Sequence, residues 1–135
     1  MTDESAKILM LGRDYDPEEG LRVTLLRGGY NVHAGRSEVE GMVELANWDP
    51  DVVLLDVTSP GLGGAGFCEQ VRASCKAQII AFSADKDPAI LIETLDAGAD
   101  DFVWTPFSLS VVEARIRACL RRALHARSQS GPLLA

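Results

Sequence analysis

Short apolar runs alternate along the chain with stretches in which apolar residues recur every third or fourth position. Short apolar runs bounded by turn-forming residues favour β-strands, and the wider spacing is typical of amphipathic helices. The pattern predicts one helix after each strand. The predicted strands are 7–11, 30–34, 52–56, 79–83 and 102–104.

Capping and helix-breaking residues mark the ends of the predicted helices. Ser and Asp accept hydrogen bonds from a first helical turn, Pro suits the first helical position, and Gly stops a helix. The first helix is expected from Asp16-Pro17 to Gly28-Gly29, the second begins at Ser37, the fourth spans Asp87-Pro88 to Gly98, and the last runs from Ser108 to near Leu124.

The spacing of apolar residues also predicts which face of each helix is buried. Residues three and four positions apart share one face of a helix. The expected inward residues are Val39, Met42, Val43 and Ala46 in the second helix, Phe67 and Val71 in the third, and Val112, Ile116, Cys119 and Leu120 in the last.

Five strands alternating with five helices predict an α/β domain built on a doubly wound parallel sheet. The run 52–56 is apolar until its last residue, as expected for a central strand covered on both faces. In such sheets the functional crevice lies at the carboxyl ends of the strands. The residues expected there are Gly12-Arg13-Asp14, 56–60, Ser83-Ala84 and Thr105-Pro106.

Composition narrows the classes of function. The length of 135 residues fits one domain. The net charge of −7 argues against binding to nucleic acid or to an anionic membrane, because both need a basic protein surface. No apolar run approaches the about 20 residues that span a bilayer, so we expect a soluble, cytoplasmic protein. The three cysteines and two histidines form no ligand or catalytic pattern, so we expect no metal site and no enzyme activity.

Several ordered segments carry a resemblance to a known family. They are Val53–Asp56 followed by Pro60-Gly61, the run 79–84, the run 97–102 followed by Pro106-Phe107, and the run 114–122. Together they resemble the receiver domains of bacterial response regulators in two-component systems. The run 114–122 is similar to the last helix of receivers attached to winged-helix DNA-binding domains.

The resemblance implies a flavodoxin-like fold with five helices and strand order 2-1-3-4-5. It assigns residues 1–124 to the receiver domain and 125–135 to a tail or interdomain linker. It also implies that the protein is a signalling module that pairs with a second copy of itself and receives its input from a histidine kinase. DNA contact is expected only through a domain that this chain does not contain.

The chemistry of the family implies a phosphorylation site that has lost several of its parts here. That chemistry uses two acidic residues after the first strand, an acceptor Asp, a Ser or Thr, and a Lys after the fifth strand. Asp56 matches the acceptor, Ser83 the switch hydroxyl and Phe102 the switch aromatic. The acidic pair falls on Gly12 and Arg13, and the lysine falls on Thr105. Since Mg²⁺ prefers oxygen ligands, we expect weak or absent magnesium binding.

Three readings of Asp56 remain open from the sequence. It is a live phosphoacceptor, a vestige paired with Arg13, or a polar strand end. Asp14 lies one residue late for the acidic pair, and with water it supports an alternative, phosphorylatable receiver that depends on Mg²⁺. Ser83 and Phe102 are equally compatible with ordinary packing.

The resemblance also implies a dimer formed through the fourth helix, the fifth strand and the fifth helix. Two positions that carry a cross-subunit salt bridge in the family are apolar here, Leu91 and Val111. We therefore expect an enlarged apolar patch ringed by charged pairs. Its apolar members are Leu91, Leu95, Val111 and Ala114, and its charged members are Asp96, Asp100, Asp101, Arg115, Arg117 and Arg122. The competing reading is that these residues pack within one subunit.

Two rival functions are weighed against this one. The run 61–66 matches the pattern GxGxxG of dinucleotide-binding proteins, but it does not follow the first strand directly, as that fingerprint requires. A stand-alone adaptor that docks a protein partner is the other rival. Whether the protein continues past Ala135 separates the adaptor from a transcription factor.

Overall fold

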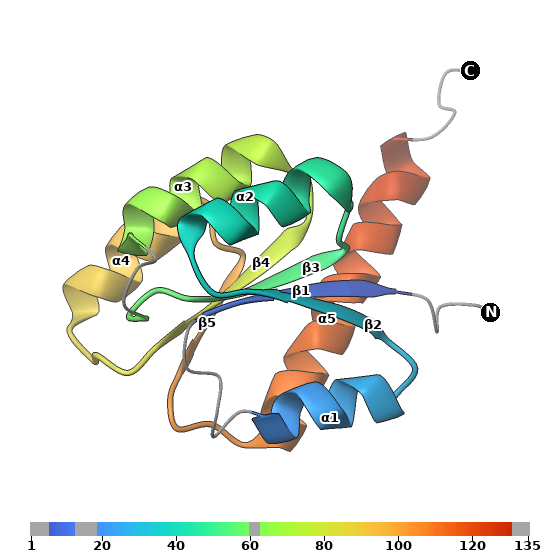
Figure 1. Cartoon of the computed structure of the whole chain (residues 1–135), viewed down its shortest axis with the longest axis horizontal. Coiled ribbons are helices and arrows are strands. Elements are labelled where there is room, and N and C mark those ends of the chain that lie inside the picture. The colour runs from blue at the N-terminus through green and yellow to red at the C-terminus, as the bar shows by residue number, and fades with distance from the viewer. Residues whose placement is uncertain (1–5, 13–18, 60–62, 131–135) are drawn as a thin grey trace.

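The computed structural model describes residues 6–12, 19–59 and 63–130 and contains one five-stranded parallel sheet of order β2-β1-β3-β4-β5 (Figure 1). The predicted fold class, strand order and number of helices are confirmed. The elements are β1 (Lys7–Leu11), α1 (Glu19–Arg27), β2 (Asn31–Gly35), α2 (Glu38–Asn47), β3 (Val52–Asp56), α3 (Gly64–Ser74), β4 (Gln78–Ser83), α4 (Pro88–Asp96), β5 (Asp101–Trp104) and α5 (Leu109–Ser130).

The sheet lies between two layers of helices. Helices α1 and α5 cover one face, and α2, α3 and α4 cover the other (Figure 1). Each face has its own apolar core, because residues that alternate along a strand point to opposite faces. Ile8, Leu54 and Ile116 belong to the core beneath α1 and α5, whereas Leu9, Val53 and Phe67 belong to the core beneath α2 and α3.

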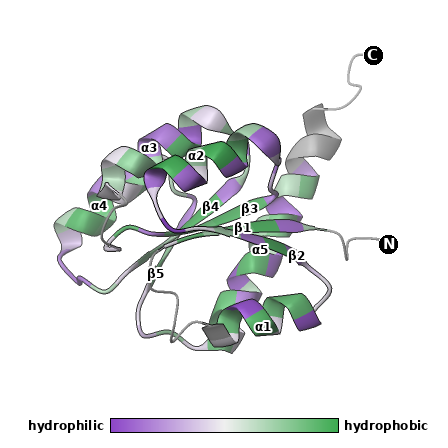
Figure 2. Ribbon diagram, in the orientation of Figure 1, coloured by the Kyte–Doolittle hydropathy of each residue, from purple (hydrophilic) through white to green (hydrophobic). Residues whose placement is uncertain are grey.

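The three central strands are apolar along nearly their whole length because both of their faces are buried (Figure 2). In β3, all four residues from Val52 to Leu55 have no exposed surface, and Asp56 is the first polar residue. The edge strand β2 differs, since only Val32 and Gly35 in it are buried. Among the described helices, none is long and apolar enough to cross a membrane.

The predicted caps that fall on described residues are confirmed. The Ser37 hydroxyl accepts a hydrogen bond from the amide of Glu40 at 3.1 Å, and the Asp87 carboxylate accepts one from the amide of Ala89 at 3.0 Å. Gly29 follows α1 with φ of 92°, a left-handed conformation that favours glycine. Asp16 and Pro17 lie outside the described residues.

The predicted inner face of α2 is wrong for three of its four residues, whereas the fourth, Met42, packs against the core as predicted. Val39 and Val43 are 74% and 54% exposed, and Ala46 is exposed as well. The helix instead turns Gly41 toward the sheet, where the backbones of Gly41 and Gly35 approach so closely that a Cβ on Gly35 would lie 3.1 Å from the nitrogen of Gly41. A Cβ on Gly41 would in turn lie 3.1 Å from Leu11 and 3.2 Å from Phe67, so both positions favour glycine where α2 turns this face to the sheet.

The predicted end of the last helix near Leu124 is also wrong, since α5 continues to Ser130. Residues 125–130 contain no Gly or Pro, so nothing in the local sequence stops the helix before Gly131-Pro132. The role of 125–135 as an interdomain linker stays a prediction.

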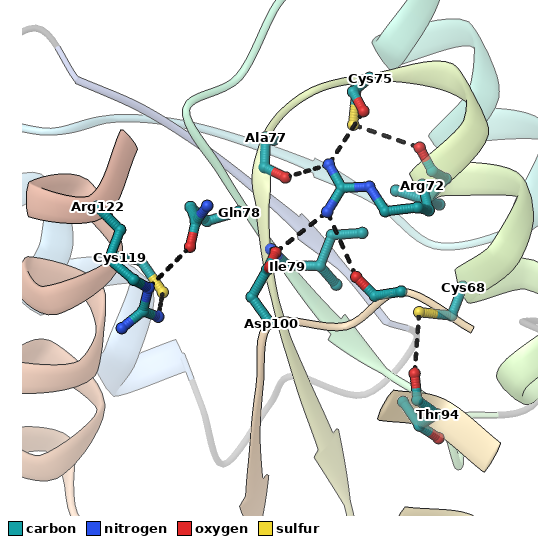
Figure 3. A network of polar contacts seen from close by, with 12 residues as sticks. Cys68, Arg72, Cys75, Ala77, Gln78, Ile79, Thr94, Asp100, Cys119 and Arg122 are labelled. Carbon is teal, nitrogen blue, oxygen red and sulfur yellow. Dashed lines mark hydrogen bonds and ion pairs between the residues drawn. The ribbon is translucent and has the colours of Figure 1, made fainter. Parts of the chain in front are cut away.

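A polar network around Arg72 ties α3 to the starts of β4 and β5 (Figure 3). The Arg72 guanidinium donates to the carbonyls of Cys75, Ala77 and Gly98 and to the carboxylate of Asp100. The same Asp100 carboxylate accepts the amide of Ile79 at 2.8 Å. One arginine thus satisfies carbonyls from two loops, which would otherwise need other partners in a half-buried position.

We predict that Gly98→Ala destabilises the protein by about 1–3 kcal/mol, measured as the free energy of unfolding in urea. Gly98 has φ of 120°, and a Cβ there would lie 2.5–2.9 Å from three side-chain carbons of Arg72. Gly66→Ala is the matched control, because a Cβ on this α3 residue meets nothing within 4 Å. The control should leave stability unchanged or raise it by up to about 1 kcal/mol. Equal stability of Gly98→Ala and the wild type would contradict the prediction.

Candidate functional site at the carboxyl edge of the sheet

Four residues singled out from the sequence lie at the carboxyl ends of neighbouring strands. Asp56 and Ser83 are the last residues of β3 and β4, and Gly12 and Thr105 directly follow β1 and β5. The strand register makes these ends neighbours, since Leu11 pairs with Leu55, Asp56 pairs with Phe82, and the amide of Thr105 donates to the carbonyl of Ser83 at 2.9 Å. Arg13 and Asp14 lie outside the described residues, so the expected Arg13–Asp56 ion pair stays a prediction.

The Asp56 carboxylate is half-buried and is oriented by Thr58. Its Oδ1 accepts hydrogen bonds from both the amide and the hydroxyl of Thr58, each at 2.9 Å. Thr58 lies within the run 56–60 that was expected at this edge, but no role of its side chain was predicted. The signal that could have found it is its spacing, because an Asp side chain commonly accepts the amide two residues later in an Asx-turn.

The other three candidates at this edge, Ser83, Gly12 and Thr105, carry no charge. The Ser83 side chain is fully buried, and its hydroxyl donates to the carbonyl of Asp85 at 2.8 Å and accepts the amide of Asp85 at 3.0 Å. Gly12 offers no side chain, and Thr105 offers a neutral hydroxyl. Within the described part of the chain, no three His, Cys, Asp or Glu side chains gather as they would to hold a metal ion.

Two further sequence candidates lie close to this edge. Phe102 on β5 is half-buried and contacts Trp104 edge-on, with ring centroids 4.9 Å apart. In the glycine-rich run 61–66, the amide of Gly63 donates to the Glu38 carboxylate at 2.6 Å. This amide is therefore already bonded to a carboxylate of the chain itself. Gly61 and Leu62 lie outside the described residues.

The face formed by α4, β5 and α5 exposes apolar side chains. Leu95 and Val111, both predicted there, are 42% and 45% exposed, Ala114 is exposed, and Leu91 is half-buried. The sequence reasoning missed Ile92, which is 57% exposed on α4. Helical spacing from Leu95 could have found it, since residues three apart lie on one face of a helix.

The charged residues expected around this face pair partly within the chain. Arg115 donates to both oxygens of Asp101 at 3.1 Å, and Arg72 donates to Asp100 at 3.1 Å. Arg122 donates to the side-chain oxygen of Gln78 and to Cys119 Sγ, each at 3.1 Å.

Asp96 and Arg117 are exposed and have no ion-pair partner among the described side chains. The geometry therefore fits the reading in which Asp100 and Asp101 act inside one subunit. The role of all six charged residues between subunits stays a prediction.

The three cysteines are not among the residues at the carboxyl ends of the strands. Burial raises the pKa of the Cys68 thiol to about 11, although nearby Arg72 acts in the opposite direction. Burial also raises the pKa of Cys75 and of Cys119. Because the thiolate is the nucleophile and the metal ligand, none of the three has the environment of a reactive cysteine.

Comparison with known sequences identifies one family. The model of the response regulator receiver domain matches residues 14–117. The transcriptional regulatory protein CseB of Streptomyces avermitilis is 38% identical over 96% of this chain and 54% of its own length. The response regulator MprA of a Mycobacterium species is 36% identical over 95% of this chain and 56% of its own length. The chain therefore spans about half the length of the curated relatives it matches.

Solved structures share the fold. A two-component response regulator from Clostridium difficile superposes with a TM-score of 0.83 at 22% identity, covering 87% of this chain and 98% of that chain. A CheY-like receiver domain protein from Methanospirillum hungatei superposes with a TM-score of 0.85 at 20% identity, covering 90% and 98%. At these identities the likeness is one of fold.

We predict that N-ethylmaleimide at pH 8 labels Cys75 before Cys68 and Cys119 in the folded protein. Cys75 is half-buried and the other two are buried. The rise in the pKa of Cys68 from 9.0 to about 11 lowers its thiolate fraction by about a hundredfold. Peptide mass mapping gives the rate for each thiol, and the three should converge in urea. Labelling of Cys68 in the folded protein at the rate seen in urea would contradict this.

Proposed function

Because this chain belongs to the family of response regulator receiver domains, we propose that it is the receiver of a transcription regulator whose phosphorylation site is degenerate. It signals by dimerisation or by binding other proteins, and this signalling is largely independent of phosphorylation. The relatives are named as transcriptional regulators, and this chain spans about half of their length. A DNA-binding domain, of the winged-helix type by the sequence of α5, is proposed for the remainder of the protein.

The observation that carries the proposal is the set of residues at the carboxyl edge. Gly12 and Thr105 stand where the chemistry of the family uses an acidic group and a lysine, and neither supplies charge. Phosphoryl transfer depends on positive groups that neutralise the developing charge, a metal ion above all. Losing one preorganised electrostatic group costs ~10²–10³ in rate, so losing the metal ligands and the lysine together costs at least ~10⁴.

Asp56 favours a second candidate, a phosphorylatable receiver. Its carboxylate is half-buried at the strand end with its Oδ1 held by Thr58, so an acceptor is present and oriented. Asp14 and water would then supply the magnesium ligands. A histidine kinase is the expected partner in this case, and magnesium titration distinguishes the two candidates.

The α4–β5–α5 face is the proposed output surface, and a second copy of the chain is its proposed partner. Leu95, Val111 and Ile92 offer exposed apolar area on it. Exposed apolar area that is buried in a dimer contributes free energy that salt does not screen, unlike charged pairs at a rim. Dimerisation through this face therefore needs no phosphoryl group.

The first test is labelling with acetyl phosphate and Mg²⁺, followed by intact mass. We expect the wild type to remain largely unlabelled. A variant with Gly12→Asp, Arg13→Asp and Thr105→Lys restores the missing groups and should label at least ~10⁴-fold faster. Adding Asp56→Asn to that variant should abolish the label.

Two results would overturn the proposal. One is stoichiometric, hydroxylamine-labile phosphate on Asp56 of the wild type, which favours the phosphorylatable receiver. The other is a restored variant that folds, as judged by circular dichroism, yet labels no faster than the wild type. In that case the missing side chains do not limit the reaction.

The second test is sedimentation velocity at micromolar concentration without phosphodonor. We expect a dimer that Leu95→Arg weakens by at least about tenfold in dissociation constant, because a charge replaces apolar contact area. Leu26→Arg on α1 is the matched control, since Leu26 is 49% exposed and Leu95 42%, on opposite layers of the molecule. A monomeric wild type, or equal weakening by both substitutions, would reject this interface.

A further inference from the structure

Thr58 connects the ends of two strands through its side chain. Its hydroxyl donates to Asp56 Oδ1 at 2.9 Å, and its Oγ1 accepts the amide of Ala84 at 3.2 Å. Asp56 ends β3, and Ala84 directly follows β4. A single exposed side chain therefore links the carboxylate of the candidate site to the start of the β4–α4 connection.

The bond from Ala84 to Thr58 replaces a contact of the sheet. The amide of Val57 donates to the carbonyl of Phe82 at 2.9 Å, so the parallel ladder continues one residue beyond β3. Continued once more, the ladder would direct the amide of Ala84 at the carbonyl of Val57. That amide bonds to the Thr58 hydroxyl instead. The last hydrogen bond between β3 and β4 is thus made to the Thr58 side chain. Its strength depends on what that side chain contacts.

The two hydrogen bonds that run from Ala84 through Thr58 to Asp56 form a relay, and the chemistry of the groups sets its direction. The Ala84 amide can only donate and an ionised carboxylate can only accept, so the hydroxyl accepts from the first and donates to the second. Hydrogen bonds arranged in series polarise one another, and a charged acceptor strengthens the bond it receives. The negative charge on Asp56 therefore strengthens the bond between Thr58 and Ala84.

The segment after Ala84 leads directly to the proposed output surface. Asp85 binds the Ser83 hydroxyl through its backbone amide and carbonyl, and its side chain accepts the amide of Asp87 at 3.0 Å. Asp87 caps α4, the helix that exposes Leu95. The backbone that follows Ala84 is thus held by a series of local hydrogen bonds that reaches from Ser83 to the first turn of α4.

We propose that Thr58 is a positioning residue through which the charge of Asp56 holds the start of the β4–α4 connection in place. The proposal rests on the proposed function in taking the carboxyl edge as the signalling site. An ionised Asp56 keeps both of these hydrogen bonds of Thr58 formed and holds the ends of β3 and β4 in one arrangement. Loss of the carboxylate as an acceptor frees the hydroxyl and loosens the bond to Ala84.

The test is amide hydrogen exchange of Ala84 in the full chain, followed by NMR without any phosphodonor. Thr58→Val keeps the shape of the side chain and removes the hydroxyl, so exchange at Ala84 should rise by about three- to tenfold, the effect of one hydrogen bond. Thr58→Ser keeps a hydroxyl and should stay within about twofold of the wild type. Thr24→Val on α1 is the matched control and should leave Ala84 unchanged.

A double-mutant cycle separates the relay from a local structural role. Asp56→Ala should raise exchange at Ala84 by about two- to fivefold in the wild-type background and should add nothing in the Thr58→Val background. A Thr58 that only packs would give independent, multiplicative effects. Such effects, or unchanged exchange in Thr58→Val, would overturn the proposal.

The outcome is separate from that of the phosphorylation test. Stoichiometric phosphate on wild-type Asp56 would remove the degenerate-site proposal and leave the coupling between Asp56 and Ala84 intact. Unchanged exchange at Ala84 in Thr58→Val would remove the relay and leave the labelling result untouched.

Discussion

Burial of the three central strands on both faces is the constraint from which the arrangement of the molecule follows. All but one residue of β1 and four of the five residues of β3 are buried, so polar side chains are confined to the strand ends. Because every strand is parallel to its neighbour, these ends gather at the same edge of the sheet. Asp56 and Ser83 therefore lie on neighbouring strands although they are far apart in sequence.

Three polar groups of the carboxyl edge find partners within the described part of the chain. Asp56 is held by Thr58, Ser83 by the backbone of Asp85, and the amide of Ala84 by the Thr58 hydroxyl. A site that uses a metal ion needs several carboxylates aimed at one point, and neither Gly12 nor Thr105 can supply charge there. This edge is therefore suited to holding a fixed arrangement of strand ends.

The opposite edge of the sheet is held by a different kind of contact. Arg72 gathers carbonyls from the α3–β4 and α4–β5 connections together with the Asp100 carboxylate, which also binds the start of β4 (Figure 3). A guanidinium suits this role because its five donors lie in one plane and can satisfy several acceptors at once. Asp100 therefore has a structural role within one subunit, whatever it contributes between subunits. By contrast, the carboxyl edge depends at Ala84 on a single hydroxyl.

The sequence by itself determined the order of the elements, the parallel sheet and the residues at its carboxyl edge. Apolar runs, caps and spacing act within a few residues, and they placed every strand to within one residue of its observed bounds. The tertiary structure alone decided the rotation of α2, where Gly41 meets Gly35, and the pairing of Asp100 with Arg72. It also decided the bond from Ala84 to Thr58, which joins residues 26 positions apart. Periodicity shows which residues share a face of an element, but the neighbour that packs against the element decides which face turns inward and which polar groups meet.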